Sequence, residues 1–274
     1  LIVSDNIYRE SKVIWDITEK NIKEYITSAK ENIIITQGFI AGTLDNTTTT
    51  LGREGSDYTA SIFAYSVNSP EVIIWKDVDG VYNADPKYFN DIIKINNISY
   101  QEAIELAYYG ASVIHPKTIK PLKNKEIVLK VKSFVIPQKE GTIISNINDN
   151  DIGSIPFYII KPVQTLISIN PKDFSFIAED NLSEIFACFS KYNIKMNMMQ
   201  NSALSFSVCI DKSNKIDGVI NELKTKFKIK YNENLELITI RHYNNANINS
   251  VVKGREIILE QKSRSTLQLL VKND

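Results

Sequence analysis

Residues 38–60 read GFIAGTLDNTTTTLGREGSDYTA, and this segment indicates the fold class more directly than any other. The apolar β-branched run Ile33 to Ile35 precedes it and predicts a buried strand, while a helix is expected to begin near Ser56. A strand, a loop rich in glycine and hydroxyl groups and a helix N-terminus form a layout that binds phosphates or carboxylates. Arg53 can hold a carboxylate at two points, and the hydroxyls of residues 47–50 can add hydrogen bonds.

The same composition would also suit an ordinary surface turn, because a glycine-rich loop is weak evidence by itself. Further along, strands are predicted at Val72 to Trp75 and Ile127 to Val131, with a helix from Tyr100 to Tyr109 that ends at Gly110. Strands that alternate with helices imply an α/β domain with a mainly parallel sheet flanked by helices. Such sheets bind ligands at the carboxyl ends of their strands, so the loops after the first two strands should face one cleft.

The charge balance narrows the class of partner. The chain has 274 residues, of which 32 are basic and 32 acidic, so no basic excess points to nucleic acid or to an anionic membrane. The longest apolar runs are far shorter than the ~20 residues of a membrane span. The two cysteines, Cys188 and Cys209, have no metal-type spacing, and a reduced cytoplasmic setting is the default for such a chain. With only two histidines and two cysteines, a structural zinc site is not expected.

A change of composition divides the chain. Residues 146–156 are rich in Asn, Asp, Gly and Ser, and they predict a linker between a first domain at 1–145 and a second region at 157–274. The chain opens on an apolar Leu1 instead of a methionine, which suggests that it begins inside a domain.

The second region contains an internal repeat. LISI at 166–169 parallels LITI at 237–240, and a βαββ order surrounds each of them. Two small α+β modules of ferredoxin-like type are therefore expected, the first at about 163–233. The second would span about 234–274, and because no helix follows its last strand, it should borrow a strand from 157–161.

Charged residues follow the two predicted strands, and among them Arg53 suits an anionic substrate. Ser56 could donate to the group that Arg53 holds and could also cap the helix. Asp57 could orient a substrate amine or a metal-bound water, although an acidic residue in a first helical turn is also favoured by the helix dipole alone. Asp77 and Asp79 suit a nucleotide or Mg²⁺, unless they only form turns. No Walker-type phosphate loop is present in the sequence.

Five motifs together resemble the aspartokinases, a family with the amino-acid kinase fold followed by paired ACT domains. The resemblance covers essentially the whole chain, and it implies a partial amino-acid kinase domain followed by two ACT modules. The motifs are TQGFI (36–40), TTTLGREGSDYTA (48–60), WKDVDGVY (75–82), DP (85–86) and YGASVIHP (109–116).

The resemblance implies that ATP, with Mg²⁺, phosphorylates the side-chain carboxylate of L-aspartate to give 4-phospho-L-aspartate. This reaction is the first step towards lysine, threonine and methionine in a cytoplasmic enzyme that is homodimeric through its ACT modules. The implied aspartate-binding residues are Phe39, Arg53, Glu54, Gly55 and Ser56, with Asp57 and Arg53 as the catalytic residues. The implied nucleotide-binding residues are Lys76, Asp77, Tyr82, Lys87, Ser112 and Val113, and no protein metal site is implied.

Several positions depart from the family pattern. Many members have Thr in place of Lys76 and Lys in place of Ser112, and the Lys-Phe-Gly-Gly segment that contacts phosphate in the family is absent from this sequence. The chain alone is therefore expected to be inactive, and a non-catalytic, effector-binding ACT protein stays an alternative. A kinase for glutamate, acetylglutamate or carbamate is a third possibility. His115, before a proline, favours a structural role over that of a catalytic base.

The effector site implied by the resemblance uses Asn197 and Ser202. Many lysine-sensitive relatives have Asp in place of Asn197, and a lysine ammonium needs a carboxylate partner. Lysine inhibition, threonine inhibition and insensitivity therefore all stay open at this stage.

Overall fold

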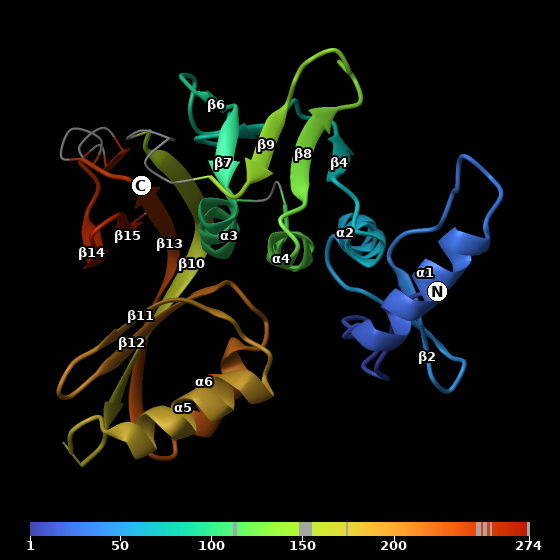
Figure 1. Cartoon of the computed structure of the whole chain (residues 1–274). Coiled ribbons are helices and arrows are strands. Elements are labelled where there is room, and N and C mark those ends of the chain that lie inside the picture. The colour runs from blue at the N-terminus through green and yellow to red at the C-terminus, as the bar shows by residue number, and fades with distance from the viewer. Residues whose placement is uncertain are drawn as a thin grey trace. The chain divides into compact units, whose positions relative to one another are not determined.

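The computed structural model describes residues 1–111, 114–147, 155–173, 175–244, 248, 251–252 and 254–272. They form two compact units, Leu1–Ile155 and Pro156–Asp274, and each unit is described by itself (Figure 1). Residues 148–154 lie outside the described residues, so a linker at 146–156 stays a prediction.

The first unit combines four helices with two sheets and a short hairpin. Its helices are α1 (Trp15–Ser28), α2 (Gly55–Val67), α3 (Tyr100–Tyr109) and α4 (Pro116–Asn124). Its strands are β1 (Val3–Ser4), β2 (Ile40–Thr43), β3 (Thr48–Thr50), β4 (Glu71–Lys76), β5 (Val81–Tyr82), β6 (Lys94–Ile95), β7 (Asn97–Ser99), β8 (Val128–Ser133) and β9 (Thr142–Ser145).

The main sheet of this unit has the strand order β4-β8-β9-β7. Strands β4 and β8 are parallel, as are β7 and β9, whereas β8 and β9 are antiparallel. Alternate residues of the strands are buried, for example Val72 and Ile74 in β4 and Leu129 and Val131 in β8. Figure 1 shows α2, α3 and α4 along one face of the sheet, which accounts for this one-sided burial.

Helix α3 and its C-cap at Gly110 confirm the prediction from the sequence. Gly110 has a φ of 119°, which glycine adopts without strain. The strand predicted at Ile33 to Ile35 is wrong. This segment is extended but unpaired, and Ile33 and Ile35 are 81% and 93% exposed. A β-branched run becomes a strand only where a neighbouring strand supplies its hydrogen bonds. Among the described residues no strand pairs with it, and β4 pairs only with β8.

The threonine-rich loop is largely a hairpin. Strands β2 and β3 pair antiparallel, with Ile40 opposite Thr50, and β1 joins them in parallel. Thr49 is buried, and its hydroxyl group lies 2.7 Å from the Ser4 hydroxyl and 3.1 Å from that of Ser11. The expectation that four hydroxyls at 47–50 would face a ligand is therefore wrong for Thr49, since the hairpin itself uses that group.

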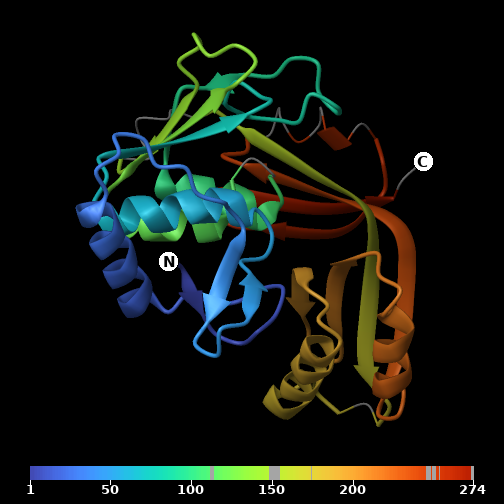
Figure 2. The ribbon, with the colours of Figure 1, turned by 90° about the vertical axis from the view of Figure 1, so that its right-hand side faces the viewer.

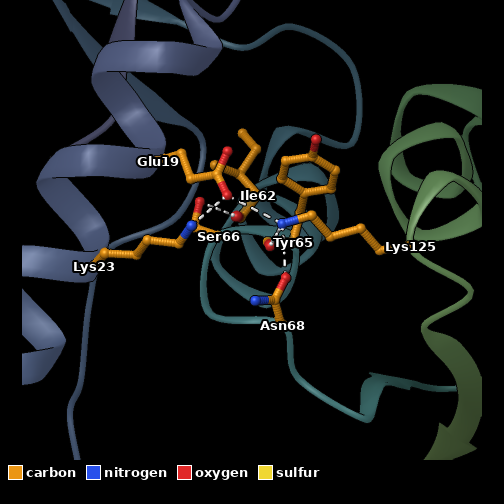
Figure 3. A network of polar contacts seen from close by, with 7 residues as sticks. All are labelled: Glu19, Lys23, Ile62, Tyr65, Ser66, Asn68 and Lys125. Carbon is orange, nitrogen blue, oxygen red and sulfur yellow. Dashed lines mark hydrogen bonds and ion pairs between the residues drawn. The ribbon is translucent and has the colours of Figure 1, made fainter.

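A lysine ties three helices of the first unit together. The Nζ atom of Lys125 donates to the Tyr65 carbonyl and to Asn68 Oδ1, each at 2.7 Å, and to Glu19 Oε1 at 3.1 Å (Figure 3). It also lies 3.8 Å from the centre of the Tyr65 ring. Since Glu19 belongs to α1 and Tyr65 to α2, this side chain just after α4 satisfies the end of α2 and fixes its neighbours.

The second unit is one six-stranded sheet with the order β11-β12-β10-β13-β15-β14. Its elements are β10 (Phe157–Pro171), α5 (Glu179–Lys191), β11 (Met196–Asn201), β12 (Phe206–Asp211), α6 (Ile216–Leu223), β13 (Phe227–Arg241), β14 (Ile257–Lys262) and β15 (Thr266–Lys272). Strands β10 and β13 have 15 residues each and can be followed along their whole length in Figure 2.

The two long strands let two ferredoxin-like patterns share one sheet. The later part of β10, α5, β11, β12, α6 and the first part of β13 make a βαββαβ run. The later part of β13, β14 and β15 start a second run, in which residues 248, 251 and 252 are helical. Residues Phe157 to Lys161 of β10 complete it by pairing with Leu237 to Arg241. Each long strand thus serves both runs.

Helices α5 and α6 cover one face of the first run. Ile185 and Phe189 of α5 and Val219 of α6 belong to one buried cluster with Ile167 and Val208 of the sheet.

Candidate functional site

The turn before α2 is built from two residues with positive φ. Gly52 has a φ of 84°, and Glu54 has a φ of 53° although it is not glycine. The helix begins at Gly55, with Glu54 as its N-cap and no side-chain cap hydrogen bond. The expectation that Ser56 caps the helix is therefore wrong, because Ser56 already lies within the first turn. The uncapped N–H groups of this turn can instead receive an anion.

Phe39 lies directly against this turn. A Cβ atom on Gly55 would come within 2.7 Å of the Phe39 ring, so only glycine allows the ring to pack there. The Phe39 N–H donates to Thr59 Oγ1 at 3.0 Å, which ties the segment before β2 to helix α2. Phe39 is 42% exposed, and Arg53 and Ser56 are also exposed, so all three side chains are available to a ligand.

An ion pair joins the end of strand β4 to the first turn of helix α2. Lys76, the last residue of β4, donates from Nζ to Asp57 Oδ2 at 2.7 Å. The Lys76 and Asp57 side chains are 24% and 17% exposed, so the pair is partly shielded from water. The residues expected to serve the amino acid and the nucleotide therefore touch each other.

Glu54 lies close to this pair. Burial raises the pKa of the Glu54 carboxyl above its usual range, the positive charge of Lys76 opposes this shift, and the negative charge of Asp57 reinforces it. A hydrogen bond from the backbone of His115 also stabilises the charged form. The Oε2 atom is buried, with no hydrogen-bond partner in the described part of the chain. Glu54 thus faces inward, towards the start of α4.

His115 has a structural role. It is the N-cap of α4, and its Nδ1 atom accepts a hydrogen bond from the Lys117 N–H at 3.1 Å. This geometry agrees with the structural reading of the sequence.

The loop after β4 carries the other residues assigned to the nucleotide. Tyr82 donates its hydroxyl to Asp79 Oδ1 at 2.5 Å, and Lys139 forms an ion pair with the same carboxylate. The bonds from Lys139 and Tyr82 lower the pKa of Asp79 to about 2, and the bond to Asp79 raises the pKa of Tyr82 to about 12. Lys139 could not be assigned to this loop from the sequence, since it lies 60 residues from Asp79.

Three further residues were assigned to the nucleotide, and the structure describes one of them. Lys87 is exposed, and its N–H donates to Asp85 Oδ1 at 2.8 Å in the turn after β5. Ser112 and Val113 lie outside the described residues. The described part of the chain contains no group of three or more His, Cys, Asp or Glu side chains that could hold a metal ion. Asp77 is exposed, so one carboxylate can meet a phosphate-bound Mg²⁺.

The two residues assigned to the effector are not brought together. Asn197 lies near the start of β11 and Ser202 directly after its last residue, about 16 Å apart for five residues of extended chain. The amide of Asn197 accepts from Lys161 Nζ at 2.9 Å and donates to Gln164 Oε1 at 2.8 Å and Asp211 Oδ1 at 2.9 Å. Ser202 is exposed in the turn to β12, with its hydroxyl 2.7 Å from that of Ser205.

Comparison with known proteins identifies the family. Residues 1–133 match the model of the amino acid kinase family. A bifunctional aspartokinase/homoserine dehydrogenase of Buchnera aphidicola is 31% identical over 99% of this chain, which spans 36% of that protein. The chain is a homologue of the aspartokinases. The lysine-sensitive aspartokinase 3 of Escherichia coli is 29% identical to this aspartokinase homologue over 86% of the chain and 54% of its own length.

Solved aspartokinase structures share the fold. The aspartate kinase of Clostridium acetobutylicum, 26% identical, superposes with a TM-score of 0.80 over 99% of this chain and 65% of its own. Aspartokinase III of E. coli in complex with aspartate and ADP, 24% identical, gives a TM-score of 0.82 over 99% of this chain and 64% of its own. The expected fold class, a kinase-type α/β unit followed by ACT-type modules, is confirmed. No helix in the described residues is long and apolar enough to cross a membrane.

Proposed function

We propose that this chain is part of an aspartokinase that phosphorylates the side-chain carboxylate of L-aspartate with ATP, giving 4-phospho-L-aspartate and ADP. The chain alone, without the Lys-Phe-Gly-Gly segment of the family, is not expected to turn over. The observation that carries the proposal is the contact between Asp57 and Lys76, which brings the substrate turn and the nucleotide loop to one point. An E. coli relative with the same fold was solved with aspartate and ADP, which supports the same pair of ligands here.

On the substrate side, the exposed guanidinium of Arg53 binds one carboxylate of aspartate through two N–H groups. Asp57 accepts a hydrogen bond from the substrate ammonium, and the uncapped first turn of α2, including Ser56, receives negative charge. Phe39 and Gly55 shape the wall beside them. The acceptor carboxylate needs no general base, because an aspartate side chain with a pKa of about 3.9 is already ionised at neutral pH.

On the nucleotide side, Lys76 and Lys87 supply positive charge, and Tyr82 is held by Asp79 at the edge of the loop. Catalysis is then a matter of positioning and charge neutralisation, as in other phosphoryl transfers. Bound Mg²⁺ would neutralise charge on the phosphates, and the exposed carboxylate of Asp77 would meet it there. Ser112 and Val113 are the remaining residues that we assign to the nucleotide.

We propose that the second unit binds an amino-acid effector, lysine or threonine, through Asn197, Ser202 or both, and joins two copies of the chain. An E. coli aspartokinase III structure solved with lysine and aspartate, 25% identical with a TM-score of 0.77, supports lysine. The exposed Met199 on the edge strand β11 supports an interface there. A cytoplasmic location agrees with the buried, unpaired Cys188 and Cys209.

The substrate can be tested by measuring ADP release with ATP and Mg²⁺ while the acceptor is varied, using a protein in which an aspartokinase segment with the Lys-Phe-Gly-Gly motif is joined to this chain. The chain alone serves as the inactive comparison. L-Aspartate should support turnover, whereas L-glutamate, acetylglutamate and carbamate should not. An Arg53→Ala variant should lose about 10- to 150-fold in kcat/KM, since a hydrogen bond to a charged group contributes about 1.5–3 kcal/mol. Turnover with one of the other acceptors, or an Arg53→Ala variant as active as the parent, would refute the assignment.

A further inference from the structure

The proposed roles of Lys76 and Asp57 do not account for the ion pair between them. Each partner is assigned to a different substrate, yet at 2.7 Å each satisfies the other. Partial burial strengthens such a pair, because little water competes for the charges. Each group also carries the same sign of charge as the other's ligand. An ammonium group that approaches Asp57 is therefore repelled by Lys76, and a phosphate that approaches Lys76 is repelled by Asp57.

We propose that this ion pair couples the two substrates by exchanging partners. Nucleotide phosphate draws Lys76 away from Asp57, and the freed carboxylate then accepts the ammonium of the amino acid. The inference rests on the proposed function and adds to it a positive coupling between the two ligands. Coupling of this kind is reciprocal, so aspartate also strengthens nucleotide binding by the same factor.

The charges around the pair support the direction of the coupling. The Lys76 and Asp57 charges both act on Glu54, and so does the charge of Arg53. Two cations and two carboxyl groups are therefore gathered at this point. When phosphate neutralises Lys76, the remaining groups carry an excess of negative charge, which attracts an ammonium. Glu54 cannot take the place of Lys76 beside Asp57, because Glu54 and Asp57 are both acidic.

The test measures L-aspartate affinity by titration calorimetry, using the full chain with and without β,γ-methylene-ATP and Mg²⁺. In the parent protein, the non-reacting nucleotide should strengthen aspartate binding about fivefold or more, the usual lower range of coupling between sites. The Lys76→Thr and Lys76→Gln variants should bind aspartate without nucleotide about as tightly as the parent does with it. In both variants the nucleotide should add less than about twofold.

The matched control is Lys130→Thr, which removes the Lys130–Glu71 ion pair at the other end of β4. It should keep the coupling of the parent. Equal aspartate binding with and without nucleotide in the parent overturns the inference but leaves the proposed function standing. So do Lys76 variants that retain the parental coupling. A parent that binds no aspartate in either condition overturns the proposed function and this inference together.

Discussion

At the scale of single residues, close packing at the substrate turn decides which side chains are tolerated. Gly55 touches the Phe39 ring, and Glu54 adopts a left-handed backbone that costs a non-glycine residue free energy. The sequence motif pointed to these residues, but it could not show that Glu54 turns inward. That carboxylate accepts a hydrogen bond from the backbone of His115, which lies 61 residues later and is the N-cap of another helix.

Replacing Gly55 with alanine tests the packing. We expect Gly55→Ala to lower the free energy of unfolding by about 1–3 kcal/mol, since the added methyl group must push the Phe39 ring aside. Urea denaturation measures this change. Gly42→Ala is the matched control, because its Cβ would meet nothing closer than 4.0 Å, and it should change stability by less than about 0.5 kcal/mol. Equal effects of the two substitutions would contradict the packing described.

The carboxyl of Asp79 gives a prediction about pH. Its pKa in the folded protein is lowered from 3.8 to about 2, so its contribution to stability is present above pH 3.8 and disappears as the pH falls through about 2. A carboxyl titration followed by NMR should give this low pKa. In a Lys139→Ala variant the pKa should rise towards 3.8, because the largest cause of the shift is removed. A normal pKa in the parent would show that the Lys139–Asp79 pair is absent in solution.

At the scale of helices and strands, local pattern predicted most of the elements but not their pairing. The helix Tyr100–Tyr109 follows from its spacing and its glycine cap, both of which are local. The strand expected at Ile33 to Ile35 failed because pairing is not local. Helix α4 gave little signal, since Pro121 lies inside it and its burial against α2 comes from the fold.

The contacts of Lys125 predict how strongly the helices are joined. We expect Lys125→Met to lower the free energy of unfolding by about 1–2 kcal/mol, because the Tyr65 carbonyl and Asn68 lose a charged donor (Figure 3). Thermal or urea unfolding would measure the loss. Lys123→Met removes an exposed charge on the neighbouring turn and should have little effect. A Lys125→Met protein as stable as the parent would show that these bonds contribute nothing net.

At the scale of the whole molecule, the chain divides into two units that are built differently. The first unit contains the turn before α2, the Lys76–Asp57 ion pair and the loop after β4. The second unit contains a sheet in which the long strands β10 and β13 are shared by two modules. The sequence repeat indicated the modules, because LISI and LITI occupy equivalent strands. Repeat patterns cannot reveal that Asn197 is held by Lys161, Gln164 and Asp211, since those contacts depend on strand register.

The central claim is that this chain belongs to an enzyme that makes an acyl phosphate on aspartate. The most direct measurement is to join this chain to an aspartokinase segment with the Lys-Phe-Gly-Gly motif and to incubate the protein with ATP, Mg²⁺ and L-aspartate in the presence of hydroxylamine, which converts an acyl phosphate into a coloured hydroxamate. The account predicts aspartyl hydroxamate in an amount equal to the ADP released, and its loss in the Arg53→Ala variant. ADP without hydroxamate, or hydroxamate formation that does not depend on aspartate, would contradict it.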